Sequence, residues 1–188
     1  MGTVVEIICQ NKEAINAAFD EMEKIDKIAN SFNPASELSA LNTKGEIKAS
    51  PDLINMLKES LRFYDISNGA FDITVKPVVD IWKTKIKEAQ TPAGQTVYPP
   101  SREEIKEKLR LIGSNKILVN SESYVKFIEA GMAIDLGAIA KGYAVDKAAS
   151  RIKELGIKSA LINAGGNIYC LGKKFNKRWH IGIQHPRR

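Results

Sequence analysis

One stretch constrains the fold more than any other, because an apolar run there meets a turn of small residues and continues as an amphipathic segment. It reads Ile134-Asp135-Leu136-Gly137-Ala138-Ile139-Ala140-Lys141-Gly142-Tyr143-Ala144-Val145-Asp146. A change of hydrophobic period across a turn predicts a strand joined closely to a helix. A second small-residue turn follows in Asn163-Ala164-Gly165-Gly166-Asn167. The chain is therefore expected to contain both helices and sheet.

The first of these turns has the outline of a phosphate site. Asp135 is expected at the N-cap of a helix running to about Leu155, where free N–H groups attract negative charge. Lys141 would lie about two turns into that helix. Gly142 costs roughly 1 kcal/mol relative to Ala, which makes sense if a ligand or another backbone needs the space. Tight packing of a helix on a sheet, with an ordinary cap, explains the same residues, and both interpretations stay open.

Composition and charge indicate the class of partner. The 188 residues are 44% apolar and 27% charged, with a net charge of +6. These fractions are typical of a globular protein, and the positive charge indicates an anionic partner. The lysines are scattered, and no stacking aromatic residues lie between them. This pattern favours a phosphate-bearing small molecule over nucleic acid.

Other features bear on metal sites, disulfides and membranes. Cys9 and Cys170 lie far apart without the spacing of a metal site or a disulfide framework, so both are expected to be small buried hydrophobic residues. No apolar run is long enough to span a bilayer. The chain opens on a strand-like segment without a signal peptide. A cytoplasmic protein and one trimmed of its export signal would look the same.

Local signals place the helices and loops. A helix capped by Asn11 is expected to run to about residue 30, and one capped by Ser50 to about residue 68. A third is expected from the capping box Ser101–Glu104 to just before Gly113. Residues 31–38 form an irregular link in which Phe32 is expected to be a core anchor, with a ligand shelf as the alternative. Residues 88–100 are polar and contain proline, and are expected to form a surface loop or an insertion.

Alternating apolar residues place the strands. They are expected at 3–8, 70–75, 117–119, 124–128, 132–136, 159–164, 168–171 and 179–183. The 70–75 strand would stop at Pro77, with Asp72 and Thr74 on one face. These elements predict an α+β fold, with a mixed, largely antiparallel sheet and helices on one side of it.

Six motifs occur in the order and at the spacing found in the ApbE proteins, flavin transferases formerly called thiamine-biosynthesis lipoproteins. They are Met1-Gly2-Thr3, Phe32-Asn33-Pro34 with Ser36-Glu37-Leu38, Gly69–Val75, Asp135–Tyr143, Ala164–Asn167 and Gln184-His185-Pro186. They extend over essentially the whole chain, which therefore resembles the N-terminal part of this family. The resemblance implies an ApbE, T-fold-like architecture with the flavin in a cleft between layers.

The resemblance also implies an activity, that of an FAD:protein FMN transferase. Such an enzyme transfers the FMN half of FAD to a Thr or Ser hydroxyl of an acceptor protein and releases AMP, with Mg²⁺ at the diphosphate. Acceptors in the family are subunits of the Rnf and sodium-pumping quinone reductase type. An FAD pyrophosphatase, in which water replaces the hydroxyl, and a non-catalytic flavin-binding fragment remain as alternatives.

By position, the family's ligand contacts fall on a small set of residues. FAD would contact Met1, Phe32, Ala70, Phe71, Asp72, Asp135 and Lys141, and the main chain of Gly165, Gly166 and Asn167 would line the pocket. The carbonyl of Ala138 would be a Mg²⁺ ligand. No catalytic base is identified, because His180 and His185 are each expected to be structural at a strand end.

Family members continue beyond the counterpart of this chain into a portion that carries the other metal ligands. Residues 1–188 are therefore expected to be the N-terminal portion of an ApbE-like flavin transferase, with the missing C-terminal portion supplied by the same polypeptide or by a second chain. Relatives are often exported and anchored by lipid, so the cell envelope is the expected location. A cytoplasmic location is the alternative.

Overall fold

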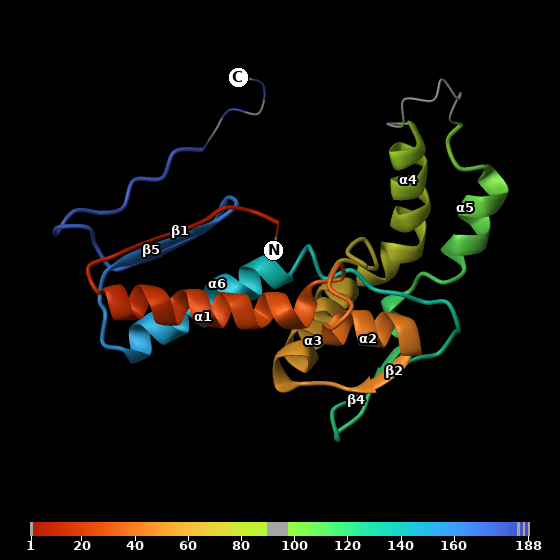
Figure 1. Cartoon of the computed structure of the whole chain (residues 1–188), viewed down its shortest axis with the longest axis horizontal. Helices are drawn as coiled ribbons and strands as arrows, with labels where there is room; N and C mark the ends of the chain where they lie inside the picture. Colours follow the sequence, from red (N-terminus) through yellow and green to blue (C-terminus); the bar gives the residue numbers. More distant parts are fainter. Residues whose placement is uncertain (1, 90–97, 184, 186, 188) are drawn as a thin grey trace. The chain divides into compact units, whose positions relative to one another are not determined.

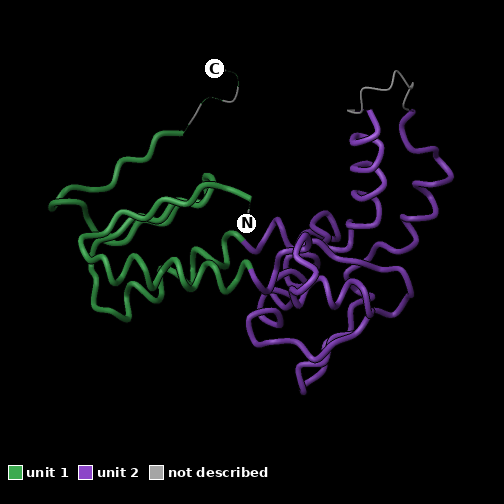
Figure 2. The backbone as a smooth tube through the Cα atoms, in the orientation of Figure 1, with its two compact units in different colours: residues 1–26, 141–188 green, residues 27–140 purple. Residues whose placement is uncertain are grey.

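The computed structural model of the chain describes residues 2–89, 98–183, 185 and 187. They form two compact units, which Figure 2 shows in separate colours. Unit 1 comprises residues 1–26 and 141–188, and unit 2 comprises residues 27–140. A three-stranded sheet lies in each unit, so each unit is described by itself.

Unit 1 is an antiparallel sheet with two helices along one side. The strands are β1 (Val5–Cys9), β5 (Ala160–Ala164) and β6 (Asn167–Leu171), in the order β1-β5-β6. In Figure 1, α1 (Lys12–Ala29) and α6 (Ala140–Glu154) are both seen on the same side of β1 and β5. Small and aliphatic residues of the two helices are buried: Ala14, Ala18, Met22, Ala144, Ala148 and Ile152. These residues form part of the hydrophobic core of unit 1.

Most predicted elements of unit 1 are confirmed. In the sheet, Ile7 faces Ile162, which faces Tyr169 on the other side. Gly165 and Gly166 have φ of 57° and 93°, as a two-residue hairpin turn with the twist of its strands requires. The strands at 3–8, 159–164 and 168–171 and the helix at 11–30 are present, with small shifts at their ends.

The strand expected at 179–183 is wrong. Residues 178–183 pair with no strand in the described part of the chain, and the indole N–H of Trp179 donates to the carbonyl of Leu171 at 3.1 Å. His180 and His185 are exposed and lie outside any strand, so they are not structural at strand ends. An alternation of apolar residues forms a strand only where a neighbouring strand takes up its hydrogen bonds.

The prediction of two buried cysteines is also wrong. Cys170 is exposed and Cys9 is half-buried, and neither is in a disulfide. Cys170 lies on β6, at the edge of the sheet, where the side chains of Ile168 and Cys170 alternate with the better buried Tyr169 and Leu171. Alternating residues in a sequence predict that a strand has two different faces, but they do not predict which face other parts of the protein cover.

Unit 2 contains the second antiparallel sheet, with strands β2 (Glu46–Lys48), β3 (Ile117–Val119) and β4 (Tyr124–Phe127) in the order β2-β4-β3. Its helical elements are α2 (Glu37–Lys44), α3 (Pro51–Ile66), η1 (Ile73–Val75), α4 (Lys76–Ala89), α5 (Arg102–Leu109) and η2 (Ser114–Lys116). The core residues are at most 2% exposed: Leu38, Leu41, Leu53, Met56, Leu57, Ile73, Val125, Ile134 and Leu136. This unit therefore has a hydrophobic core of its own.

Two helices of unit 2 begin where local chemistry predicts. The Ser50 hydroxyl accepts a hydrogen bond from a first-turn N–H of α3, and Pro51 occupies the first helical position. The carboxylate of Glu37 accepts from the Ser50 N–H at 2.8 Å, which links α2 to the start of α3. The capping box over residues 101–104 is present at the start of α5.

The strand expected at 70–75 is wrong. Asp72 Oδ1 accepts from the N–H of Thr74 at 2.8 Å, which caps the 3₁₀ turn of η1, and this turn runs directly into α4. Pro77 lies buried in the first turn of α4, where its missing N–H leaves no hydrogen bond unmade. The β-branched residues 73–75 imitate a strand, but the cap and the following helix fix a helical backbone.

Three other segments differ from the prediction. The irregular link at 31–38 ends at Ser36, which caps α2, and neither α2 nor β2 was predicted. The expected loop at 88–100 overlaps the end of α4; residues 98–100 are irregular, and residues 90–97 lie outside the described part. Residues 132–136 form no strand. The main chain of Ile134 is hydrogen-bonded to the side chain of Asn42, and the Asp135 N–H donates to the Ile73 carbonyl, so no described strand pairs with this segment.

The α+β fold is confirmed, with a correction to its sheet. The described strands form two separate three-stranded sheets, and every pair within them is antiparallel, so no mixed sheet is present among them. Within the described residues, no helix combines the length and apolar character needed to cross a membrane.

Candidate functional site

The carboxylate of Asp72 joins the start of η1 to the start of η2, 42 residues further along the chain. Its Oδ1 accepts hydrogen bonds from the hydroxyls of Thr74 and Ser114, at 2.6 and 2.7 Å, and its Oδ2 accepts from the Ser114 N–H at 3.3 Å. Thr74 is fully buried, and its hydroxyl oxygen accepts from the Gly113 N–H at 2.7 Å. Oδ1 is therefore committed to internal donors, and only Oδ2 has capacity for a ligand.

The same turn holds the segment that contains Asp135. The carbonyl of Ile73 accepts from the Asp135 N–H at 2.8 Å. The side chains of Met132, Ile134 and Leu136 are at most 2% exposed, so alternate residues anchor this segment in the core. Asp72 is followed directly by Ile73, to which the Asp135 N–H is hydrogen-bonded. Unit 2 thus brings together Asp72 and Asp135, two of the predicted FAD contacts.

The predicted cap at Asp135 is wrong. The helix α6 begins at Ala140, and Asp135 Oδ1 accepts from the Gly137 N–H at 2.7 Å, which makes a side-chain turn ahead of the helix. Lys141 is therefore the second residue of α6 and not two turns into it. Gly142 lies in α6, and apart from the helix's own backbone no described atom lies within 4 Å of an added Cβ. Packing within the described chain does not require glycine there.

The turn after Asp135 presents small residues to solvent. Gly137 and Ala138 are exposed, whereas Leu136 before them and Ala140 after them are buried. The main chain at this turn is therefore accessible, with no large side chain of its own to cover it. A diphosphate that binds to main-chain groups needs such an approach.

The side chain of Asn42, in the last turn of α2, holds the main chain just before this turn. Its Nδ2 donates to the Ile134 carbonyl at 3.0 Å, and its Oδ1 accepts from the Ile134 N–H at 2.8 Å. The two residues are 92 positions apart in the chain. The side-chain amide therefore satisfies both main-chain groups of one buried residue, as a neighbouring strand would.

Sequence reasoning missed the residues that support the site, namely Asn42, Gly113 and Ser114. A signal for α2 was present, because Ser36 can cap a helix and Gly45 follows the last turn with φ of 76°. Those signals place Asn42 on a helix. No local signal identifies Ile134 as its partner.

The aromatic residues predicted to contact FAD have unequal environments. Phe32 is 82% exposed, so the core-anchor interpretation is wrong; the ammonium of Lys83 lies 5.4 Å from the centre of its ring. Phe71 is half-buried, with its ring centre 5.8 Å from that of Phe63. Ala70 before it is exposed. An exposed aromatic face at Phe32 is compatible with the ligand-shelf alternative.

The remaining predicted contacts lie in unit 1 or outside the described residues. Lys141 is half-buried in the first turn of α6. Gly165 and Gly166 are exposed in the hairpin turn, and Asn167 is the exposed first residue of β6. Met1 lies outside the described residues. Lys141 and residues 165–167 therefore belong to unit 1, whereas the other described residues predicted to contact FAD belong to unit 2.

A magnesium site is not assembled by the described residues alone. They contain no group of three or more His, Cys, Asp or Glu side chains that could hold a metal ion. The predicted ligand, the carbonyl of Ala138, belongs to an exposed residue. Mg²⁺ demands near-octahedral oxygen coordination, which one carbonyl does not provide.

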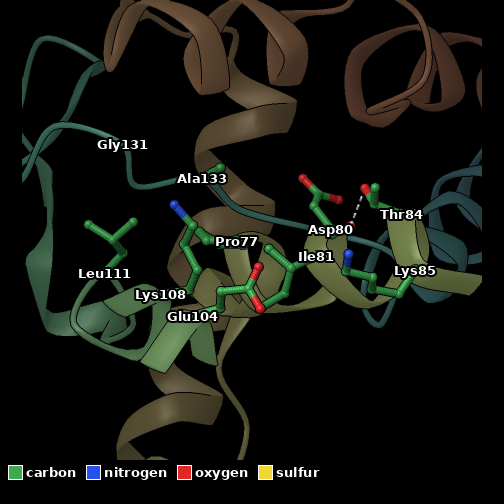
Figure 3. Close-up of a pocket in the computed structure, with 10 residues that line it drawn as sticks. All are labelled: Pro77, Asp80, Ile81, Thr84, Lys85, Glu104, Lys108, Leu111, Gly131 and Ala133. Carbon is green, nitrogen blue, oxygen red and sulfur yellow. Dashed lines mark hydrogen bonds between the residues drawn. The ribbon is translucent and has the colours of Figure 1, made fainter. Parts of the chain in front are cut away.

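A separate pocket of about 440 Å³ lies between α4 and α5 (Figure 3). It is lined by Pro77, Asp80, Ile81, Thr84, Lys85, Glu104, Lys108, Leu111, Gly131 and Ala133, none of which is a predicted site residue. Asp80 pairs with Lys76 at 2.8 Å, and the hydrogen bond from the Ser101 N–H lowers the pKa of Glu104. Two acidic and two basic side chains leave no surplus of positive charge for a diphosphate, so this pocket is not the candidate flavin site.

Comparison with known proteins connects the sequence and fold of this chain to one family. The family described as the ApbE family matches residues 1–188. A Haemophilus influenzae protein named FAD:protein FMN transferase is 28% identical over 99% of this chain and 57% of its own length. A Treponema pallidum protein of the same name is 27% identical over 92% of this chain and 51% of its own length. The chain thus spans just over half the length of these relatives.

Solved structures show the same fold. The ApbE protein from Thermotoga maritima has a TM-score of 0.85 and 28% identity, over 100% of this chain and 62% of that one. The flavin transferase ApbE from Vibrio cholerae has a TM-score of 0.84 and 24% identity, over 99% of this chain and 62% of that one. At such identities the likeness of the Vibrio protein concerns the fold alone.

Proposed function

The chain belongs to the ApbE family, and from that premise we propose that it serves the transfer of FMN from FAD to an acceptor protein. Relatives with 27–28% identity bear the name FAD:protein FMN transferase. The observation that carries the proposal is the exposed turn at Gly137 and Ala138, set on a segment whose alternate side chains are buried. It offers accessible main chain on a rigid support.

The proposed reaction is a phosphoryl transfer without change of oxidation state. The hydroxyl oxygen of an acceptor Thr or Ser forms a bond to the phosphorus of the FMN half. The bond from that phosphorus to the bridging oxygen breaks, and AMP leaves with the electron pair. A base takes the hydroxyl proton. The part of this chain is to bind and orient the diphosphate at the Ala138 main chain.

Magnesium dependence belongs to the same proposal. The Ala138 carbonyl would supply one ligand, and the described residues do not cluster the others. A bound ion would neutralise charge on the diphosphate oxygens. Supported by the family resemblance alone, the proposed acceptors are subunits of the Rnf and sodium-pumping quinone reductase type, and the proposed location is the cell envelope.

The test is incubation of the protein with FAD, Mg²⁺ and an acceptor domain that has a target Thr. We expect the acceptor to gain the mass and fluorescence of FMN, with an equal amount of AMP, and an acceptor with Ala at the target to gain neither. Free FMN formed without acceptor would instead favour the pyrophosphatase. Bound FAD without AMP release would favour a flavin-binding fragment.

A pair of matched variants tests the turn itself. Ala138→Leu places a branched side chain over the exposed main chain, so FAD binding should weaken at least about tenfold, the effect of roughly 1.4 kcal/mol. Ala130→Leu makes the same change at another exposed position and should leave binding unchanged. Flavin fluorescence titration measures both. Equal affinities would remove the Ala138 turn from the binding site.

A further inference from the structure

We propose that Asn42 is a positioning residue, which sets the main chain leading to Asp135 and Ala138 and through it the affinity for FAD. The inference rests on the proposed function, since it concerns the same turn. No contact between Asn42 and the ligand is part of it. Asn42 acts through the main chain of Ile134.

The Asn42 side chain makes the two hydrogen bonds to Ile134 that a residue of a neighbouring strand would make. Asn42 Oδ1 accepts from the Ile134 N–H at 2.8 Å, and Nδ2 donates to the Ile134 carbonyl at 3.0 Å. Ile134 itself is fully buried. A buried main-chain N–H or carbonyl without a partner is strongly unfavourable, so the segment depends on this amide.

The next hydrogen bonds along the chain explain how the effect reaches the turn. The Asp135 N–H donates to the Ile73 carbonyl at 2.8 Å, and the Asp135 carboxylate accepts from the Gly137 N–H at 2.7 Å. Ala138 follows directly. A displacement at Ile134 therefore moves the start of this series, and the turn at Gly137 and Ala138 moves with it.

The charged groups around Asn42 do not compete for its amide. Asn42 lines a hollow of about 420 Å³, whose charged residues are Lys44, Glu46, Lys126 and Glu129. Glu46 pairs with Lys126 at 3.1 Å, and this hydrogen bond lowers the pKa of Glu46. Glu129 pairs with Lys116 at 2.7 Å. Both carboxylates are thus compensated by lysines, and the Asn42 amide makes its hydrogen bonds to Ile134.

The first part of the test compares Asn42→Ala with Thr43→Ala by FAD fluorescence titration. The Thr43 hydroxyl donates to the Ser39 carbonyl within α2 and is exposed, so its loss changes the same helix without touching Ile134. Asn42→Ala removes both hydrogen bonds to Ile134, and FAD should bind about tenfold more weakly. Thr43→Ala should bind FAD as the unmodified chain does.

The second part uses Asn42→Asp, which keeps the shape of the side chain. At neutral pH the new carboxylate accepts from the Ile134 N–H but repels the Ile134 carbonyl, so FAD binding should weaken. Protonation gives the carboxyl an O–H that donates to that carbonyl. Its FAD affinity, relative to the unmodified chain, should therefore recover as the pH falls toward about 4. Asn42→Ala has no such group and should show no recovery.

Each outcome decides a separate point. If the unmodified chain binds no FAD, the proposed function fails and this inference with it. If the unmodified chain binds FAD and both Asn42 variants bind it equally well, the inference alone is overturned. If Asn42→Ala does not fold, the pH dependence of Asn42→Asp decides, and a relative affinity that stays constant with pH overturns the inference.

Discussion

Asp72 is predicted from the family resemblance to contact FAD, whereas its partners within the fold were not predicted. Its carboxylate accepts from Thr74 and Ser114, and these donors come from η1 and from the start of η2. The proposed contact with FAD would use Oδ2, which accepts a single hydrogen bond in the described structure. The contacts of Oδ1 are structural.

Asp72→Asn tests that structural role. Both oxygens of the Asp72 carboxylate accept hydrogen bonds, and in the variant an NH₂ group replaces one of them. This NH₂ group cannot accept from the hydroxyl or N–H that it faces, so the variant should lose about 1–3 kcal/mol of unfolding free energy. Asp65→Asn makes the same change at an exposed position of α3 and should be within about 0.5 kcal/mol of the unmodified chain. Urea denaturation compares them. Coincident unfolding curves would show that the Asp72 contacts do not stabilise the fold.

The two glycines of the β5–β6 turn differ in what surrounds them. Both have positive φ, so each Gly→Ala change should cost about 1–2 kcal/mol. An added Cβ at Gly165 would also overlap the hydroxyl of Thr3, whereas nothing lies within 4 Å at Gly166. Gly165→Ala should therefore lower the thermal unfolding midpoint more than Gly166→Ala. The reverse order would contradict the contact with Thr3.

The capping box of α5 gives a prediction at the scale of one element. The Ser101 N–H, with the Ser101 hydroxyl and Lys85 contributing less, lowers the pKa of Glu104 from its ordinary value of 4.5. Because the folded pKa lies below the unfolded one, this stabilisation is fully present above pH 4.5 and is lost as the pH falls through the folded pKa. Amide hydrogen exchange of residues 102–109 should therefore show reduced protection at acid pH.

Glu104→Gln is the control for that prediction. Its amide oxygen can accept from the Ser101 N–H at every pH, so the contribution of this side chain no longer depends on pH. The acid-induced loss of protection in α5 should shrink in the variant. An unchanged loss would assign the effect to carboxyl groups elsewhere.

Elements were predictable where their signals lie within a few residues. Ser50 with Pro51, and Ser101 with Glu104, mark helix starts through contacts inside one turn. The 3₁₀ turn after Asp72 resembles a strand in sequence because Phe71, Ile73 and Val75 alternate with the polar Asp72 and Thr74. Its backbone is fixed by the hydrogen bond from the Thr74 N–H to the Asp72 carboxylate and by helix α4, which follows it. The alternation of apolar residues predicts neither of these.

At the scale of the whole molecule, unit 2 is continuous in sequence and unit 1 is not. β1, from the first residues, pairs with β5 more than 150 residues later. Unit 2 has its own sheet and buried core within residues 27–140. The order of folding steps can therefore differ between the units, because closing the longer loop costs more entropy.

This difference predicts the behaviour of two fragments. Residues 30–139 should fold alone, with helical circular dichroism and cooperative urea unfolding, since they contain the β2-β4-β3 sheet and its surrounding helices. Residues 141–188 alone should not, because β5 lacks β1 and the helix α1 is absent. An unfolded 30–139 fragment would show that the core of unit 2 depends on unit 1.

The sequence by itself determined the α+β class, the starts of the helices at Ser50 and Ser101, and the small-residue turn at Gly137 and Ala138. Only the tertiary structure decided that Asp72 joins Ser114 and that Asn42 holds Ile134, contacts that span 42 and 92 positions. Helix caps and hairpin turns are short-range, so residue type and spacing predicted the starts at Ser50 and Ser101 and the turn at Gly165 and Gly166, although they missed the caps at Ser36 and Asp72. Contacts between distant segments depend on how the core packs, and no local pattern records that.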